Sequence, residues 1–124
     1  MTNIEIRAYH CDGFGHVNNA RWLELFDEAR WQFWQDRDYA WFKNQQLAIV
    51  SSRIEIDYLR PAITGDSISI TSTWEAFEPR AAWLTQTATR NGKPLASARV
   101  KLAVLGPDSP RALDLAGELL EKLR

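Results

Sequence analysis

The stretch HCDGFGHVNNARWLELFDEAR, from His10 to Arg30, carries the clearest structural pattern of the chain. Beyond Asn19 its apolar residues recur at helical spacing, at Trp22, Leu25, Phe26, Ala29 and Phe33. Asn18 or Asn19 is the candidate N-cap, because a short side-chain oxygen can accept a hydrogen bond from an amide that the helix leaves unpaired. The stretch therefore predicts one long amphipathic helix, entered through a glycine-containing junction.

Strand patterns lie on both sides of this helix. Before it, Asn3 to Tyr9 alternates, with Ile4, Ile6 and Ala8 on one side. After the helix and an aromatic connector, four strands are expected, at Leu47 to Leu59, Ser67 to Phe77, Ala81 to Arg90 and Leu95 to Leu105. Asn91-Gly92, between the last two, is a strong hairpin signal. The pattern predicts an antiparallel meander.

A shorter helix is expected at the end of the chain. Ser109 is its predicted N-cap and Pro110 its first residue, and the apolar positions that follow are Leu113, Ala116, Leu120 and Leu123. The predicted order is β-α-β-β-β-β-α. A solitary long helix must bury its apolar stripe on the sheet, so the predicted class is α+β, with the sheet curled around the helix. Residues 1–124 are expected to form one domain.

Charge and apolar content exclude several classes of partner. Of 124 residues, 15 are Lys or Arg and 16 are Asp or Glu, which gives a formal net charge of −1. This balance offers no broad cationic surface for nucleic acid or anionic lipid. No apolar run approaches the roughly 20 residues of a membrane-spanning helix. The first residues lack the pattern of a secretory signal, so a cytoplasmic location is expected.

The junction before the long helix holds both histidines and the only cysteine. A metal site of His10, Asp12 and His16 would lack the fourth ligand of a closed site, so no metal is expected. Cys11 as a nucleophile would need a neighbouring imidazole, yet on an extended strand it points away from His10 and Asp12. A small buried side chain is the favoured role for Cys11.

Asp12 leaves two interpretations open. Beside a glycine-rich turn and a helix N-terminus, its carboxylate can attack a carbonyl carbon or activate water while free amides stabilise the oxyanion. In the other interpretation Asp12 only caps the turn, and Gly13 and Gly15 only relieve backbone strain. The residues around Asp12 give these two interpretations similar weight.

A resemblance to a known family favours the catalytic interpretation. The stretch from His10 to Arg30 resembles the signature of the hot-dog-fold acyl-CoA thioesterases of the 4-hydroxybenzoyl-CoA thioesterase type. IDYLRPAITGDSISI, from Ile56 to Ile70, resembles the family's strand with its Arg-Pro and Gly-Asp turns. RNGKPLASARVKLAVL, from Arg90 to Leu105, resembles its closing hairpin. The resemblance covers nearly the whole chain and implies a long helix wrapped by a curved antiparallel sheet.

The resemblance also implies roles for individual residues. The catalytic carboxylate falls on Asp12, as nucleophile or general base, and the oxyanion amides fall at Asn19 and Asn18. Arg80 lies where some relatives hold a coenzyme A phosphate. Further candidates for substrate contact are Gly15, His16, Ser51 and Ser52, the two serines because their strand is expected to cross the helix near Asp12. No metal or redox cofactor is needed for this chemistry.

The family also suggests a partner and an assembly. The expected substrate is an acyl-CoA, or an acyl carrier protein thioester, and the expected assembly is a homodimer with active sites at the subunit interface. A dimer of dimers is common among relatives. Trp31, Trp34 and Trp41 can line an acyl pocket or belong to the core or a subunit contact, and the second role is favoured. A hot-dog hydratase or dehydratase, using His10 or His16, and a non-catalytic acyl-CoA-binding module are the alternative functions.

Overall fold

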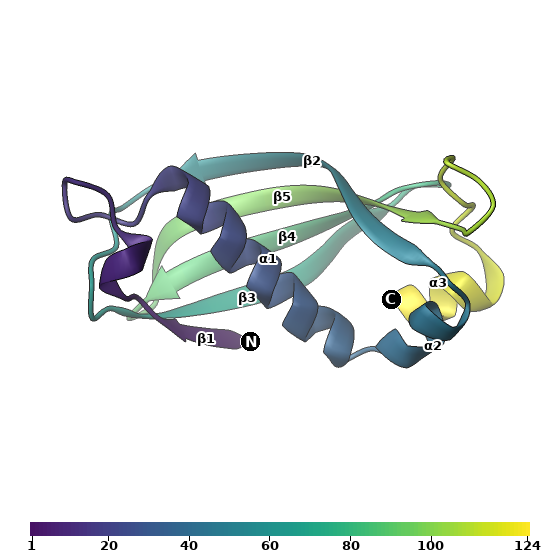
Figure 1. Ribbon diagram of the computed structural model, residues 1–124, viewed down its shortest axis with the longest axis horizontal. Helices are drawn as coiled ribbons and strands as arrows, with labels where there is room; N and C mark the ends of the chain where they lie inside the picture. Colours follow the sequence, from purple (N-terminus) through teal and green to yellow (C-terminus); the bar gives the residue numbers. More distant parts are fainter.

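One long helix crosses one face of a five-stranded antiparallel sheet (Figure 1). The computed structural model describes residues 1–124. Its elements are β1 (Thr2–Glu5), the 3-10 turn η1 (Ala8–His10), α1 (Asn19–Gln35), α2 (Tyr39–Asn44), β2 (Ala48–Tyr58), β3 (Ser67–Phe77), β4 (Ala82–Arg90), β5 (Lys93–Leu105) and α3 (Gly117–Leu123). The predicted α+β class, with a sheet wrapped around a long helix, is confirmed.

The strand order β1-β3-β4-β5-β2 places β1 and β2 at the two edges of the sheet. β1 has only 4 residues, whereas β2 has 11, so one edge is short and the other long. The predicted hairpin between β4 and β5 is confirmed: Asn91 and Gly92 have φ angles of 52° and 78°, which suits a turn with two left-handed residues. The meander of β3, β4 and β5 is also as predicted.

Helix α1 is held to the sheet by its apolar stripe. Trp22, Leu25, Phe26 and Ala29 are at most 2% exposed, and burial of a large apolar side chain contributes about 1.5 to 3 kcal/mol. The N-cap is Asn18, whose side-chain oxygen accepts a hydrogen bond from Ala20 N–H at 2.8 Å. The helix and its cap therefore follow the sequence prediction closely.

The first strand ends earlier than its alternation predicts. β1 stops at Glu5, and Ile6 then donates to Asp66 O at 2.8 Å and accepts from Gly65 N–H at 2.8 Å. Beyond Ile6 the chain turns into η1, where His10 N–H donates to Arg7 O at 3.0 Å. Ala8 is therefore exposed instead of lying beside Ile6, and the prediction of a strand to Tyr9 is wrong.

The last helix starts later than predicted. Ser109 accepts a hydrogen bond from Arg111 N–H at 3.1 Å within a local turn, and it caps no helix. The chain then follows β5, where Leu113 N–H donates to Val104 O at 2.8 Å, and Leu115 N–H donates to Pro79 O at 2.8 Å. These long-range bonds keep the segment extended, so α3 begins only at Gly117.

The two short helices meet at the end of the sheet far from the α1 N-terminus (Figure 1). The aromatic connector forms α2, and its N-cap Asp38 accepts a hydrogen bond from Lys122 of α3 at 2.7 Å. This hydrogen bond is the main cause that lowers the pKa of Asp38. None of the helices, the 17 residues of α1 included, is long and apolar enough to cross a membrane.

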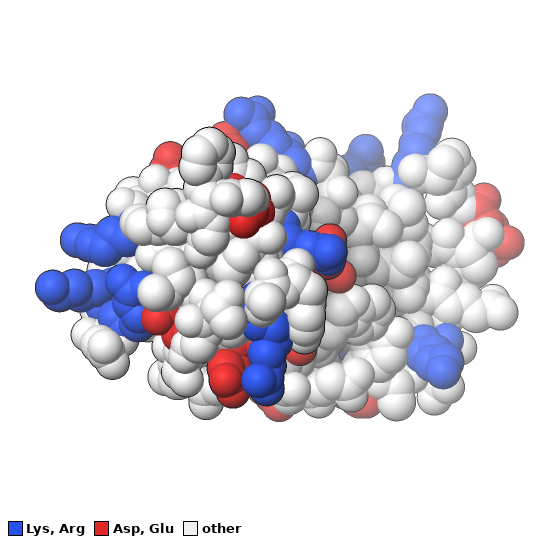
Figure 2. All heavy atoms as spheres, turned by 60° about the vertical axis from the view of Figure 1, so that its left-hand side comes forward, with Lys and Arg blue, Asp and Glu red and all other residues white.

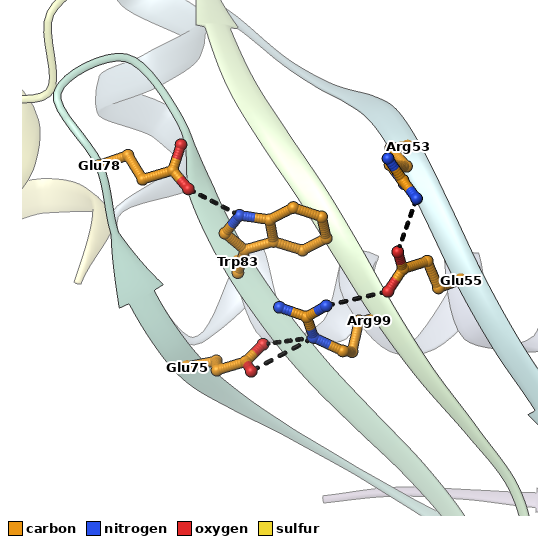
Figure 3. A network of polar contacts seen from close by, with 6 residues as sticks. All are labelled: Arg53, Glu55, Glu75, Glu78, Trp83 and Arg99. Carbon is orange, nitrogen blue, oxygen red and sulfur yellow. Dashed lines mark hydrogen bonds and ion pairs between the residues drawn. The ribbon is translucent and has the colours of Figure 1, made fainter.

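The sheet face opposite α1 carries a network of paired charges (Figure 3). Arg99 of β5 lies between Glu55 of β2 and Glu75 of β3, at 2.9 Å from each, and Arg53 lies 2.9 Å from Glu55. The hydrogen bond from Arg99 to Glu75 is the main cause that raises the pKa of Arg99. The Arg99 guanidinium also stacks over the indole ring of Trp83, with Cζ of Arg99 4.4 Å from the ring centroid. Only the α1 side of the sheet thus carries the apolar core.

Candidate active site

The loop between η1 and α1 fixes the carboxylate of Asp12 by one of its two oxygens. Oδ1 accepts hydrogen bonds from Phe14 N–H at 2.9 Å and, more weakly, from His16 N–H at 3.4 Å. Oδ2 has no hydrogen-bond partner in the chain, and the residue is exposed. The carboxylate is thus oriented by its own loop while one oxygen stays available to a ligand.

The loop closes through a tight turn that needs a glycine. Gly15 has φ of +80°, a left-handed conformation that side chains rarely adopt, and its N–H donates to Asp12 O at 3.0 Å. Asp12 N–H in turn donates to His16 O at 2.8 Å. Gly15 therefore serves the backbone of the loop, and the turn presents Asp12 and His16 together.

The first turn of α1 leaves one amide of the predicted pair unpaired. Asn18 N–H donates to His10 O at 2.9 Å, so it is already committed within the chain. Asn19 N–H has no acceptor in the chain, as expected for the first residue of a helix. Asn18 therefore orients the helix start, while Asn19 presents a donor in the positive field of the helix N-terminus.

Asp12 and Asn19 line the same hollow, of about 250 Å³. His16 lines it as well, and the His16 imidazole makes no hydrogen bond within the chain. Opposite them lies the end of β2, where Tyr58 O–H donates to Asn19 O at 3.1 Å. Arg60 also lines the hollow and donates to Pro94 O at 2.6 Å. A carboxylate, a free amide, an imidazole and a cation thus converge on one space.

A partly buried ion pair fixes the far wall of this hollow. Asp66 Oδ2 accepts from Arg90 at 2.6 Å and from Ile63 N–H at 2.9 Å, and Arg90 also donates to Pro61 O at 3.3 Å. Burial raises the pKa of the Asp66 carboxyl, but the hydrogen bonds from Ile63 and Arg90 outweigh it and hold the pKa below its ordinary value. Because Pro61 lines the hollow, this pair positions its wall.

We expect Asp66→Asn to destabilise the protein by about 1 to 3 kcal/mol at neutral pH, because the charged hydrogen bond to Arg90 is lost. A carboxyl with a lowered folded pKa stabilises above its unfolded pKa of about 3.9, and this stability is lost as the pH falls through the folded value. Urea unfolding at neutral and acidic pH measures the effect. The difference between wild type and variant should shrink towards acid, and a difference that stays constant would contradict the pair's role.

The structure places the remaining substrate candidates away from Asp12 in the single chain. Ser52 and Arg80 line a separate hollow together, where Arg80 pairs with Asp114 at 2.9 Å and Ser52 donates to Lys101 O at 3.3 Å. Ser51 lines a third hollow between α1 and β2. β2 reaches the Asp12 hollow with its C-terminal end, at Tyr58, and the two serines lie towards its N-terminal end.

Cys11 and the histidines form no second reactive group. Cys11 is half-buried, and its sulfur contacts Arg7 O at 3.8 Å and Thr64 Oγ1 at 3.5 Å, without an imidazole beside it. His10 Nδ1 accepts a hydrogen bond from Arg7 N–H at 2.8 Å. No three histidine, cysteine, aspartate or glutamate side chains cluster in a way that could hold a metal ion.

The sequence did not single out Tyr58, Trp22 or Arg60 as site residues. All three line the Asp12 hollow. Tyr58 is the last residue of β2, and Arg60 directly precedes Pro61. The turn signal at Arg60-Pro61 was the one clue to their position. On the side of the molecule turned forward in Figure 2, basic and acidic side chains are scattered among neutral ones.

Comparisons with known proteins agree with the fold and show the family of the chain. A family model described as the thioesterase-like superfamily matches residues 6–123. The long-chain acyl-CoA thioesterase FadM of Escherichia coli (strain K12) is 38% identical over 126 residues, which cover 99% of this chain and 96% of FadM. YbaW, a probable thioesterase from Escherichia coli, superposes with a TM-score of 0.93 at 37% identity, over 98% of this chain and 94% of YbaW.

A second similar structure was solved with ligands. A thioesterase from Thermus thermophilus, complexed with coenzyme A and Zn, has a TM-score of 0.83 and 26% identity. The match covers 99% of this chain and 95% of that thioesterase. The hot-dog architecture predicted from the sequence is therefore confirmed by solved structures as well as by the strand order.

Proposed function

Because the chain belongs to the thioesterase-like superfamily and is a thioester hydrolase, we propose that it cleaves acyl-CoA, or acyl carrier protein, thioesters to the free acid and thiol. The observation that supports the site is that Asp12, with a free carboxylate oxygen, and Asn19, with a free amide, line one hollow. The likeness to a long-chain acyl-CoA thioesterase supports the substrate class.

In the proposed reaction Asn19 N–H donates to the thioester carbonyl oxygen, and the N-terminal end of α1 stabilises the charge that develops there. Asp12 Oδ2 then either attacks the carbonyl carbon or takes a proton from a water molecule that attacks it. In both routes the carbon–sulfur bond breaks and the thiolate leaves. The direct route passes through an acyl-Asp12 anhydride, which water hydrolyses to the acid.

Other residues assist in this proposal. His16 faces the same hollow and can carry the proton to the leaving thiolate, while Gly15 keeps the loop closed. Asn18 caps the helix and holds the loop, and the free oxyanion donor is Asn19. Ser52 stays a prediction as a substrate contact, and Arg80 stays a prediction as a contact of a coenzyme A phosphate. No metal ion is proposed, because the residues at the site offer no ligand set for one.

We further propose a dimer through the free edge at β2. An 11-residue edge strand leaves a row of unpaired backbone groups, which a second copy can cover by continuing the sheet across a twofold axis. Pairing about such an axis runs the two β2 strands antiparallel, so the Tyr58 end of one lies near the Ala48 end of the other. The Asp12 hollow of one subunit would then adjoin the hollow between α1 and β2 of its partner. Two dimers can associate further into a tetramer.

Amide exchange tests this edge. Leu59 N–H donates to Leu95 O of β5 at 2.8 Å. Backbone N–H groups along an antiparallel strand point alternately to one side and the other, so the N–H groups of Ile54 and Ile56 point to the free edge. We expect the amides of Ile54 and Ile56 to exchange slowly at high protein concentration and to lose protection on dilution. Glu55 and Asp57 turn towards β5 and serve as the internal control. Rapid exchange at Ile54 and Ile56 under all concentrations would exclude pairing through β2.

Thiol release from a panel of acyl-CoA and acyl carrier protein thioesters tests the activity. We expect free thiol and free acid in equal amounts, at a rate unchanged by a chelator. Hydration of an enoyl-CoA without thiol release would instead identify a hydratase. Saturable acyl-CoA binding with neither reaction would identify a binding module and contradict the proposal.

A further inference from the structure

The hollow that Ser51 lines, of about 220 Å³, lies between α1 and β2 and is separate from the Asp12 hollow. Eight of its eleven lining residues are hydrophobic, and aromatic rings from α1 and α2 dominate it: Trp31, Trp34, Tyr39 and Phe42. An engineered apolar cavity of about 150 Å³ can hold benzene, so this space suffices for a group of ring size. We call it the α1–β2 pocket.

One lining residue does not fit an apolar pocket. Arg30 is only 6% exposed, and the α1–β2 pocket is the one hollow that it lines. Its Nη1 donates to Gln86 Oε1 at 2.9 Å and its Nη2 donates to Asp27 Oδ1 at 3.3 Å. A guanidinium has five N–H donors, so two are used and three have no acceptor in the chain. The pocket wall therefore contains a charged group with spare hydrogen-bond donors.

Burial of the charged Arg30 guanidinium costs free energy of folding. Burial lowers the pKa of Arg30, which shows that the surroundings disfavour its charge even though Asp27 opposes the effect. An apolar residue of similar length could anchor α1 on the sheet without that cost. The unused donors and the pocket beside them point to a ligand atom that accepts hydrogen bonds.

We propose that the α1–β2 pocket receives the acyl group of the thioester and that Arg30 selects acyl groups bearing an uncharged oxygen, a hydroxyl or a keto group, within the chain. The aromatic walls bury the hydrocarbon part of such a group. The spare N–H donors of Arg30 meet its oxygen. Arg30 thereby determines specificity and takes no part in bond breaking.

The charge around the pocket favours a neutral oxygen over a carboxylate. Asp27, whose side chain is 59% exposed, lines the pocket and already opposes the Arg30 charge. A carboxylate on the acyl group would meet Asp27 as a like charge. Ser51, whose hydroxyl has no partner in the chain, adds a neutral donor and acceptor to the same pocket. A hydroxyl or keto oxygen can use both Arg30 and Ser51 without repulsion.

This inference rests on the proposed thioesterase activity and on the proposed dimer. Within one chain the α1–β2 pocket and the Asp12 hollow share no residue. Pairing through β2 would bring the pocket of one subunit next to the Asp12 hollow of the other. A thioester held at Asp12 and Asn19 would then extend its acyl group across the interface towards Arg30.

The test compares substrates that differ only in one oxygen. We would measure kcat/KM for octanoyl-CoA and for a series of hydroxy- and keto-octanoyl-CoA esters with the oxygen moved along the chain. The wild type should favour the best oxygenated ester over octanoyl-CoA by roughly tenfold or more, since hydrogen bonds to charged groups contribute well above neutral ones. In Arg30→Met this preference should fall to about one. Equal rates on all esters, or a preference that survives in Arg30→Met, would overturn the proposal.

Two further variants separate recognition from stability. Arg30→Met leaves Gln86 without its donor, so the double variant Arg30→Met/Gln86→Met removes both polar partners and keeps the side-chain volume. It should lose the preference in the same way while remaining folded. Arg21→Met is the matched control, because Arg21 pairs with Glu24 on the same helix at 2.8 Å and lies outside the pocket. A purely structural Arg30 would lower the rates on all esters together and leave their ratio unchanged.

Direct binding separates this inference from the proposed function. Cyclohexanol and cyclohexane are matched probes, and Trp31 and Trp34 in the pocket wall report their binding by fluorescence. If no thioester is hydrolysed, the proposed function fails, but an Arg30-dependent preference for cyclohexanol would still support the pocket's selectivity. Equal binding of both probes to wild type and Arg30→Met would overturn the selectivity whether or not the enzyme hydrolyses thioesters.

Discussion

Asp12→Asn is expected to lower the turnover of an acyl-CoA ester by about a hundredfold or more, because the amide can neither attack the thioester nor take a proton from water. The variant should fold normally, since an asparagine side-chain oxygen can still accept the hydrogen bond that Phe14 N–H donates to Asp12. Thiol release under saturating substrate measures the loss, and circular dichroism checks the fold. Wild-type turnover in this variant would remove Asp12 from the mechanism.

A matched control and an isotope experiment sharpen this result. Asp57→Asn changes an exposed carboxylate near the C-terminal end of β2 that makes no hydrogen bond or ion pair through its side chain, and it should leave turnover unchanged. A single turnover in water labelled with heavy oxygen distinguishes the two roles of Asp12. Label in the Asp12 side chain identifies attack by the carboxylate, because it arises only when water cleaves an acyl-Asp12 anhydride at the Asp12 carbonyl carbon. Activation of water by Asp12 leaves label only in the released acid.

Gln86→Leu is expected to destabilise the protein by about 3 kcal/mol or more, the largest effect on stability of any single change considered. Gln86 is fully buried and accepts from Arg30 while donating to Phe26 O at 3.1 Å and to Ser72 Oγ at 3.0 Å. Leucine fills a similar volume but leaves the buried Arg30 charge with only Asp27. Urea unfolding at neutral pH measures the change.

The neighbouring strand position gives the control for Gln86. Thr87 lies next along β4 and faces the opposite side of the sheet, so Thr87→Val should shift the free energy of unfolding by only about 0.5 kcal/mol. The double variant Arg30→Met/Gln86→Met should recover part of the stability that Gln86→Leu loses, because no buried charge is left unpaired. If Gln86→Leu unfolds at the same urea concentration as the wild type, the buried network contributes little to the fold.

The parts of the fold that local sequence determines could be predicted. The apolar period of α1, its Asn18 cap and the Asn91-Gly92 turn depend on neighbours within a few residues, and all three were found. The end of β1 and the start of α3 depend on hydrogen bonds to distant segments, from Ile6 to Asp66 and from Leu113 to Val104. No local pattern reports such bonds, so both boundaries were misplaced.

The candidate site shows the same division. Asp12, His16 and Asn19 lie within eight positions of one another, and one short loop brings them to the same hollow. Tyr58 and Arg60 reach that hollow from a strand about forty residues away, which only the sheet register reveals. The pairing of Arg30 with Gln86, 56 positions apart, is equally invisible in the sequence.

The outer face of the sheet has a consequence for how a nucleotide can be held. Arg53 and Arg99 are already matched by Glu55 and Glu75, and the Glu78 carboxylate accepts from Trp83 Nε1 at 2.9 Å. That surface supplies its own counter-charges, so a polyphosphate would have to displace a carboxylate to gain an arginine there. Arg60, whose guanidinium meets only a backbone carbonyl, offers its charge to an incoming phosphate without any exchange of partners.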